Sequence, residues 1–313
     1  MSAPLRLGTR RSPLATAQAE LVARALTERT GRAVELVPVT TYGDTSRAAL
    51  TQIGGTGVFV GALREALTSG DVDVAVHSLK DLPTTQPDDV VIAAVPPRED
   101  PRDALVARDG LTLGELPSGS RVGTGSPRRA AQLRVLGLGL EVVEVRGNVD
   151  TRLRLVADGQ IDAVVLARAG LARLGRLDTV TEVLDPLQML PAPGQGALAV
   201  ECRTPVDPHT AELFALLGTL DDAATRLVVE AERTLLATLE AGCSAPVGAY
   251  GEAADGEHVL ELYLRAVVSA VDGSASVRLS ATGPLVEAAR IGRDLAADLL
   301  AEGAADLMLE RVT

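Results

Sequence analysis

One pattern that occurs twice along the chain constrains its fold more than any other feature. Residues 5–13 read as a strand that leads through Gly-Thr to Ser-Pro, and residues 120–127 repeat this order. In both copies the serine is suited to cap a helix whose first residue is the proline. A Gly-x-(Val/Ile)-Asp strand then follows each copy, at 70–76 and at 159–165. Because both motifs repeat in the same order, we expect two lobes of like architecture.

Strands and helices alternate through both lobes, which indicates the α/β class. Residues 72–76 are apolar and β-branched apart from one Asp, which is typical of a strand in a buried parallel sheet. The expected strands are 5–8, 35–39, 72–76, 90–95, 120–123, 141–145, 161–165 and 197–202. The expected helices are 13–29, 58–69, 127–136 and 148–158.

Two breaker segments, 96–101 and 190–196, predict hinges between the lobes. The strand at 197–202 would carry the chain back to the first lobe. Two-lobed proteins with paired hinges commonly hold a ligand in the cleft.

The sequence changes character after residue 221. A long helix over 223–240 precedes alternating strands at 258–268 and 274–282, joined by the hairpin signal Asp272-Gly273. A last amphipathic helix runs from Pro284 to about 301, so this part is a small α+β domain. The expected domains are 1–97 with 197–218 (first lobe), 101–191 (second lobe) and 221–313 (third domain).

Composition excludes several classes of function. The net charge is −12, whereas nucleic acids and anionic membranes call for a basic face. Aromatic residues make up 2% of the chain, so extended base-stacking surfaces are not expected. With two cysteines, no apolar run long enough to span a bilayer and no apolar leader, we expect a cytoplasmic protein that binds neither nucleic acid nor membrane.

Polar residues follow the strand at 72–76: His77, Ser78, Lys80 and Asp81, with Lys80 the only lysine of the chain. Ligands of open α/β sheets bind beyond the carboxyl ends of strands. Spacing leaves Asp81 open between a general acid/base, a group that stabilises a cation, and a partner in a salt bridge. For His77 a core imidazole is the preferred interpretation.

Arginines at helix starts are the strongest physical signal in the sequence. Helix N-termini attract anions, and guanidinium groups bind carboxylates in bidentate fashion. Ser12, Thr124 and Ser126 at the same helix starts fit caps and ligands equally well. Arg154 reads as a solvated surface residue. Physical reasoning favours an anion-binding role for Arg10, Arg128 and Arg129, whereas Arg146, Arg152 and Arg173 lie further along the chain and are left open at this point.

The two cysteines differ in setting. Cys243 lies between Gly242 and Ser244 just past a predicted helix, which fits an accessible nucleophile or attachment point as well as an inert thiol. Cys202 alternates with apolar residues on a strand, which favours core packing. No metal-ligand spacing is present, and no metal is expected.

Together these residues resemble the porphobilinogen deaminase (hydroxymethylbilane synthase) family over nearly the whole chain. The matching segments, in the family's order, are residues 9–15 (TRRSPLA), 75–83 (AVHSLKDLP), 122–129 (VGTGSPRR), 146–153 (RGNVDTRL), 193–197 (PGQGA), 201–203 (ECR) and 242–248 (GCSAPVG).

The resemblance implies two lobes like those of periplasmic anion-binding proteins, plus a third domain. It implies a transferase that joins four porphobilinogen molecules head to tail, releases ammonia and hydrolyses off the linear hydroxymethylbilane. The product would grow on a dipyrromethane cofactor held by a thioether to Cys243. Asp81 would stabilise the positive pyrrole nitrogens and assist proton transfer, and the enzyme would be a monomer.

The resemblance also assigns the remaining contacts. Phe59 would stack on a pyrrole ring. Gln52 and Thr56 stand at positions where many members of the family carry lysines. Cofactor contacts would come from Ser78, Lys80, Asp81, Thr124, Ser126, Arg128, Arg129 and Arg146. Substrate contacts would come from Arg10, Ser12, Phe59, Arg146, Arg152, Arg173 and Gln195.

Two alternatives remain. A non-catalytic two-lobed anion-binding or effector-sensing module would explain the lobes and the arginines, but neither Cys243 nor the third domain. A nucleic-acid binder using residues 121–154 is disfavoured by net charge and by the shortage of aromatic residues.

Overall fold

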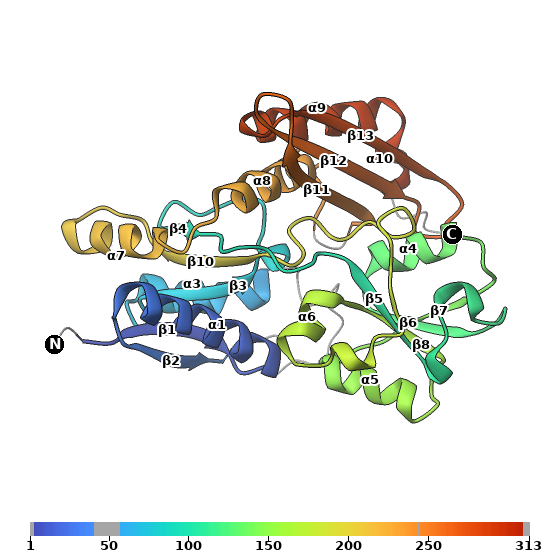
Figure 1. Ribbon diagram of the computed structural model, residues 1–313, viewed down its shortest axis with the longest axis horizontal. Helices are drawn as coiled ribbons and strands as arrows, with labels where there is room; N and C mark the ends of the chain where they lie inside the picture. Colours follow the sequence, from blue (N-terminus) through green and yellow to red (C-terminus); the bar gives the residue numbers. More distant parts are fainter. Residues whose placement is uncertain (1–2, 41–56, 243–244, 309–313) are drawn as a thin grey trace. The chain divides into compact units, whose positions relative to one another are not determined.

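The computed structural model describes residues 3–40, 57–242 and 245–308 (Figure 1). These form two five-stranded sheets and one three-stranded sheet. The chain divides into two compact units. The first comprises Met1–Glu99 with Ala197–Arg226, and the second Asp100–Gly196 with Leu227–Thr313.

The first sheet belongs to the first unit and has the strand order β2-β1-β3-β10-β4. Strand β1 is parallel to β2 and β3, whereas β10 is antiparallel to β3 and β4. The prediction of a parallel sheet around 72–76 is confirmed for the pairing of β3 with β1, whereas the returning strand β10 inserts on the other side of β3 in the opposite direction. The strands are β1 Leu5–Arg10, β2 Val34–Val39, β3 Val74–Ser78, β4 Val90–Ala94 and β10 Leu198–Arg203.

Local signals define the first helix of this unit. Ser12 caps α1 (Pro13–Thr30), and Gly31 ends it in the left-handed conformation with φ 66°. The other helical segments of the unit are α3 Gly57–Thr68, η1 Leu79–Asp81 and α7 Pro208–Gly218.

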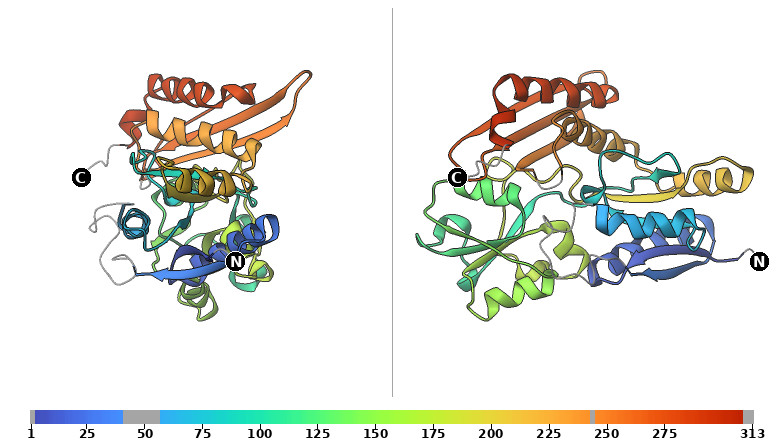
Figure 2. Two further views of the ribbon diagram at one scale, coloured as in Figure 1. Left: turned by 90° about the vertical axis from the view of Figure 1, so that its left-hand side faces the viewer. Right: turned by 180° about the vertical axis from the view of Figure 1, so that it is seen from behind.

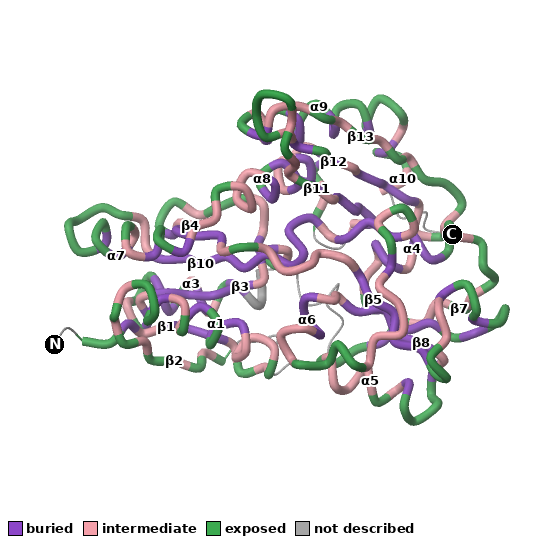
Figure 3. Tube along the Cα trace, viewed as in Figure 1, coloured by how far each residue is buried: buried purple, intermediate pink, exposed green. Residues whose placement is uncertain are grey.

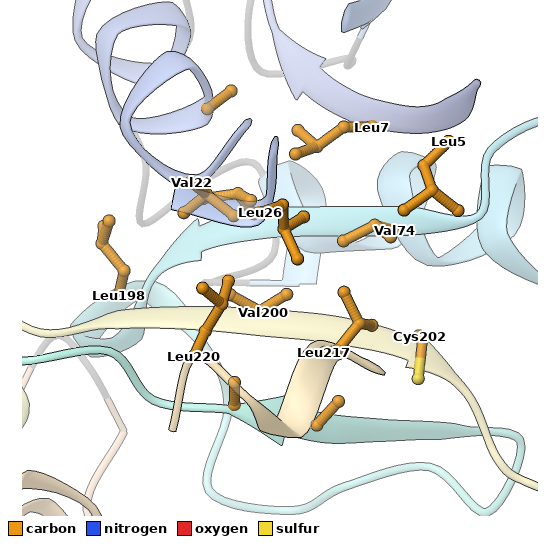
Figure 4. Close-up of a cluster of buried hydrophobic side chains, with 14 of the residues drawn as sticks. Leu5, Leu7, Val22, Leu26, Val74, Leu198, Val200, Cys202, Leu217 and Leu220 are labelled. Carbon is orange, nitrogen blue, oxygen red and sulfur yellow. The ribbon is translucent and has the colours of Figure 1, made fainter. Parts of the chain in front are cut away.

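Aliphatic side chains from helix and strands fill the core of the first unit (Figure 4). Leu7, Leu26, Val74 and Val200 are almost wholly buried there. Cys202 lies in the same cluster, and burial raises the pKa of its thiol to about 11, so the prediction of core packing is confirmed. Figure 3 shows buried residues along β10 and exposed ones along α7.

The second sheet has the order β7-β6-β8-β5-β9 and repeats the plan of the first. Strand β6 is parallel to β7 and β8, and β5 is antiparallel to β8 and β9. The prediction of two like lobes is confirmed by this shared order. The elements are β5 Asp103–Ala107, β6 Arg121–Thr124, α4 Pro127–Val135, β7 Glu141–Glu144, α5 Val149–Ala157, β8 Ala163–Ala167, α6 Arg168–Arg173 and β9 Glu182–Val183.

The third sheet is an antiparallel meander, β11-β12-β13. Helices α8 and α9 pack on each other, since a Cβ at Gly292 would collide with the backbone carbonyl of Ala231 on α8. Helix α9 packs along β12 and β13 (Figure 2), and α8 approaches β11 at Gly251. The predicted α+β character is confirmed. The elements are α8 Ala223–Thr238, β11 Val247–Asp255, β12 Leu260–Ser269, β13 Ser276–Pro284, α9 Ala288–Ala301 and α10 Ala304–Met308.

Candidate functional site

Asp81 lies on a short turn at the carboxyl end of β3. The strand ends at Ser78, and the chain then forms the 3-10 turn η1. Leu79 and Leu82 are each 1% exposed and anchor this turn in the core, whereas Asp81 is exposed. Among the residues that the structure describes, none hydrogen-bonds or ion-pairs with the Asp81 carboxylate. The fold thus presents a single acid at a strand end.

The start of α1 lies at the same edge of the first sheet, because β1 and β3 run parallel. Ser12 Oγ accepts from the N–H of Ala15 at 3.3 Å and caps the helix. One and a half turns later, Gln18 Nε2 donates to Ser78 Oγ at 2.9 Å, and Ser78 Oγ lies 3.3 Å from Gln18 Oε1. Gln18 therefore ties α1 to the strand end, a role that the sequence analysis missed.

Behind this edge the first sheet buries an ion-pair cluster. Glu201 on β10 is fully buried and accepts from Arg64 Nη2 at 2.6 Å and from Arg64 Nε at 3.1 Å. His77 is 6% exposed, and its Nε2 lies 3.3 Å from Glu201 Oε2, so His77 belongs to the core, as predicted. Burial acts to raise the pKa of Glu201, but His77 and Arg64 more than offset it and lower this pKa to about 2.

In the second unit, the Thr124–Ser126 turn joins β6 to α4. Ser126 stands at the N-cap of α4, yet its side chain makes no cap hydrogen bond. Its own N–H donates to Thr124 Oγ1 at 3.2 Å. Of the two roles left open for Ser126, cap and ligand, the structure does not show the cap hydrogen bond that Ser12 makes.

Arg128 and Arg129 point into the second unit. They are 3% and 5% exposed, and both bind the fully buried carboxylate of Asp103 on β5. Arg128 Nη2 donates at 2.8 Å, and Arg129 donates through Nη2 at 2.7 Å and Nε at 3.1 Å. Gln195 Nε2 donates to the same carboxylate at 2.8 Å.

The charges in this cluster do not balance. Burial acts to raise the pKa of Asp103, yet the two guanidinium groups hold this pKa well below its usual range. Burial lowers the pKa of Arg128, and Asp103 opposes that effect. One carboxylate thus faces two guanidinium groups, which leaves a net positive charge where β5 lies against the end of β8.

The second unit also holds the three other arginines that were expected to bind anions. Arg152 Nε donates to Gly147 O at 2.9 Å. The pKa of Arg152 is lowered, chiefly by burial and to a lesser extent by the positive charge of Arg129. No carboxylate pairs with Arg152 among the described residues. The exposed Arg146 pairs with Glu144 at 2.7 Å, and Arg173 Nη2 donates to Gly196 O at 2.6 Å. The edge that holds Thr124, Arg129 and Arg152 is therefore suited to bind an anion.

Some predicted site residues fall outside these clusters. Arg10 ends β1, and Lys80 lies on the turn η1 beside Asp81. Phe59 belongs to α3, but its side chain lies outside the described part, as do Gln52, Thr56 and Cys243. In residues 3–40, 57–242 and 245–308 no cluster of His, Cys, Asp and Glu is placed to hold a metal ion, and no helix is long and apolar enough to cross a membrane.

Fold and site together define a class: an α/β protein with two sheets of one plan, an exposed carboxylate at a strand end of the first and surplus guanidinium groups at a strand end of the second. Residues 5–211 match the family model described as porphobilinogen deaminase, dipyromethane cofactor binding domain, and residues 226–301 match the porphobilinogen deaminase C-terminal domain. The chain belongs to the porphobilinogen deaminase family.

Relatives of known name agree with this assignment. The chain is 61% identical to porphobilinogen deaminase 1 of Streptomyces avermitilis over 321 residues, which covers 98% of both chains. It is 58% identical to porphobilinogen deaminase of Mycobacterium tuberculosis over 309 residues, covering 97% of this chain and 98% of that one. The family assignment supports the enzyme and its dipyrromethane cofactor over the non-catalytic module.

Among solved structures, the methionine binding protein MetQ is similar with a TM-score of 0.42 and 18% identity, covering 69% of this chain and 89% of that one. A likeness at that level says nothing about the function of this chain.

Proposed function

We propose that the chain joins four porphobilinogen molecules head to tail with release of ammonia, and then hydrolyses off the linear tetrapyrrole hydroxymethylbilane. The observation that carries this proposal is that a chain of this family has both an exposed acid, Asp81, in its first unit and an excess of guanidinium groups over carboxylates in its second. Each pyrrole ring of the substrate brings two carboxylates, so a growing product needs several arginines. Loss of ammonia leaves a cation beside the ring, which needs a carboxylate.

The residues of the second unit fit a group that carries several carboxylates. Arg152 has no carboxylate partner among the described residues, and Asp103 neutralises only one of Arg128 and Arg129. When bound through Cys243, dipyrromethane supplies the pyrrole carbon on which the product grows. Arg152, Arg146 and Arg173 would hold carboxylates, and Thr124 and Ser126 would donate hydroxyl hydrogen bonds to them.

Asp81 would act on the substrate at the edge of the first sheet. Its carboxylate would stabilise the positive charge that develops on the substrate when ammonia departs. It would also accept a hydrogen bond from the pyrrole N–H and assist proton transfer. Ser12 and Arg10 would orient the substrate's acid groups beside it, and Lys80 and Ser78 would contact the cofactor. The anchored turn η1 fixes the position of Asp81, so little conformational entropy would be lost on binding.

Intact mass of the purified protein tests this proposal. Wild-type protein from a porphobilinogen-replete host should exceed its sequence mass by two linked pyrrole units, and Cys243→Ser should lack the excess. Cys202→Ser, which changes only the buried cysteine, is the matched control and should keep it. An unmodified wild-type chain would contradict the proposal.

The chain is further proposed to act as a monomer in the cytoplasm. The free buried thiol of Cys202 suits a reducing compartment. Light scattering coupled to gel filtration should give the mass of one chain, 32.4 kDa, and a dimer mass would refute the monomer.

A further inference from the structure

A buried carboxylate in the second unit takes no part in the chemistry proposed above. Glu232 lies on α8 and is fully buried. Its Oε1 accepts from the N–H of Gly251 at 2.7 Å, and its Oε2 accepts from the N–H of Gly194 at 2.6 Å. Burying a carboxylate is costly, and charge-assisted hydrogen bonds of this length offset part of that cost.

The two amides come from separate parts of the unit. Gly251 belongs to β11 of the third sheet, whereas Gly194 lies in the loop that precedes β10. At Gly251 a Cβ would meet Val228 of α8 at 2.9 Å, so only glycine lets helix and strand approach this closely. Glu232 thus ties the loop of residues 191–196 to the third sheet.

That loop leads directly to the arginine cluster. Gly194 and Gly196 have φ of 74° and 89°, which favours glycine, and Gln195 between them is 1% exposed. Gln195 Nε2 donates to Asp103 Oδ1 at 2.8 Å and to Pro101 O at 2.6 Å. Gly196 O accepts from Arg173. The two residues that follow Gly194 therefore bind the arginines' counter-ion and an arginine, respectively.

We propose that Glu232 is a positioning residue for substrate binding, which acts through Gly194 on Gln195, the expected substrate contact, and through Gln195 on the Asp103–Arg128–Arg129 cluster. This rests on the proposed function of those arginines as ligands of carboxylates. A carboxylate is needed because both of its oxygens accept, whereas the amide of glutamine would turn an N–H₂ group toward one of the two backbone N–H groups. The glycine-flanked loop would then shift, and Gln195 would shift with it.

The test compares Glu232→Gln with Gln195→Ala, singly and together, on protein shown by intact mass to carry its cofactor. Each single change should raise KM for porphobilinogen about tenfold, since small misplacements of binding groups are costly, while kcat stays within about twofold. The double variant should be no worse than the weaker binder of the two, because the two residues act in series. Additive effects, or an unchanged KM in either single variant, would overturn the proposal.

Two controls separate positioning from loss of stability. Val229→Ala removes buried methyl groups from the same helix and leaves the Glu232 carboxylate in place, and Glu230→Gln neutralises an exposed neighbour. Both should leave KM unchanged when assayed well below the unfolding temperature. An equal rise in KM for Val229→Ala would reduce Glu232 to a structural role.

A readout that needs no turnover keeps this inference separate from the proposed function. Amide hydrogen exchange in peptides covering 127–132 and 191–196 should quicken in Glu232→Gln and not in Val229→Ala, even if the wild type fails to consume porphobilinogen. Unchanged exchange would overturn the link from Glu232 to the arginines. If Glu232→Gln does not fold, Glu232→Asp, one methylene shorter, should show the same changes in weaker form.

Discussion

The two five-stranded sheets share one strand order, but each holds its buried carboxylate at a different position along the strands. In each sheet the fourth strand is antiparallel and carries a fully buried acid, Glu201 on β10 and Asp103 on β5. Glu201 pairs in register with Ala75, near the start of β3, whereas Asp103 pairs with Ala167, the last residue of β8. The acid of the first sheet therefore lies within the core, and that of the second lies at the strand edge where ligands bind.

The partners of these two acids differ accordingly. Glu201 is matched by Arg64 and by His77, and this cluster stabilises the sheet behind Asp81. Asp103 is outnumbered by Arg128 and Arg129, so positive charge remains at the edge. The same strand order thus presents an exposed carboxylate on the first sheet and excess positive charge on the second. The shared fold determines the positions of these side chains, and the residue types at those positions determine their charge.

The largest effect is expected at Asp81. Asp81→Ala should keep the fold and the cofactor mass but lower kcat by roughly 10²–10⁴-fold, the range for loss of a positioned acid–base group. Steady-state kinetics on cofactor-bearing protein measures this. The exposed Asp178 of the second unit is the matched control, and Asp178→Ala should be silent. Near-normal turnover of Asp81→Ala would remove Asp81 from its role.

The two buried acids should respond alike in stability and differently in binding. Asp103→Asn and Glu201→Gln each break a buried ion pair, and each should lower the free energy of unfolding by about 3–5 kcal/mol. Only Asp103→Asn should also raise KM, because only Asp103 lies at the strand edge beside the arginines. Urea unfolding and steady-state kinetics on both variants decide this, and equal changes in KM would show that the difference in depth has no functional meaning.

Acid should weaken the first sheet through Glu201. Its pKa is lowered from 4.5 to about 2 in the folded chain, so its contribution is present above pH 4.5 and is lost as the pH falls toward 2. A shift of this size corresponds to about 3 kcal/mol. Unfolding free energies measured from pH 6 to pH 2 should fall less steeply in Glu201→Gln than in wild type. The exposed Glu212→Gln is the control, and a parallel fall in all three proteins would contradict the assignment.

Sequence pattern predicted the parts of this fold that depend on local signals. The cap at Ser12 and the hairpin at Asp272-Gly273 each follow from local residue preferences, and the structure shows both. The repeat of these signals predicted the duplicated lobes. Strand β5 was missed because it begins with a charged residue directly after a proline-rich segment, where a hinge was expected.

The sequence predicted several residues of the candidate site but not the hydrogen bonds and ion pairs that join them. The resemblance marked Arg128, Arg129 and Gln195, but their common partner Asp103 lies 26 residues from Arg129 and 92 from Gln195. No local signal marks a buried acid whose partners come from distant segments. Gln18 and Glu232 were missed for the same reason, since each reads as an ordinary polar helix residue until the fold places its partner.

The smallest expected effect concerns the two Ser-Pro helix starts, which look alike in sequence. Ser12 makes a cap hydrogen bond and Ser126 does not. Ser12→Ala should therefore lower the free energy of unfolding by about 1 kcal/mol, and Ser126→Ala by much less. If Ser126 donates to a carboxylate instead, Ser126→Ala should raise KM while stability stays unchanged. Equal losses of stability would mean that Ser126 does cap α4, and the two lobes would then differ less than their contacts indicate.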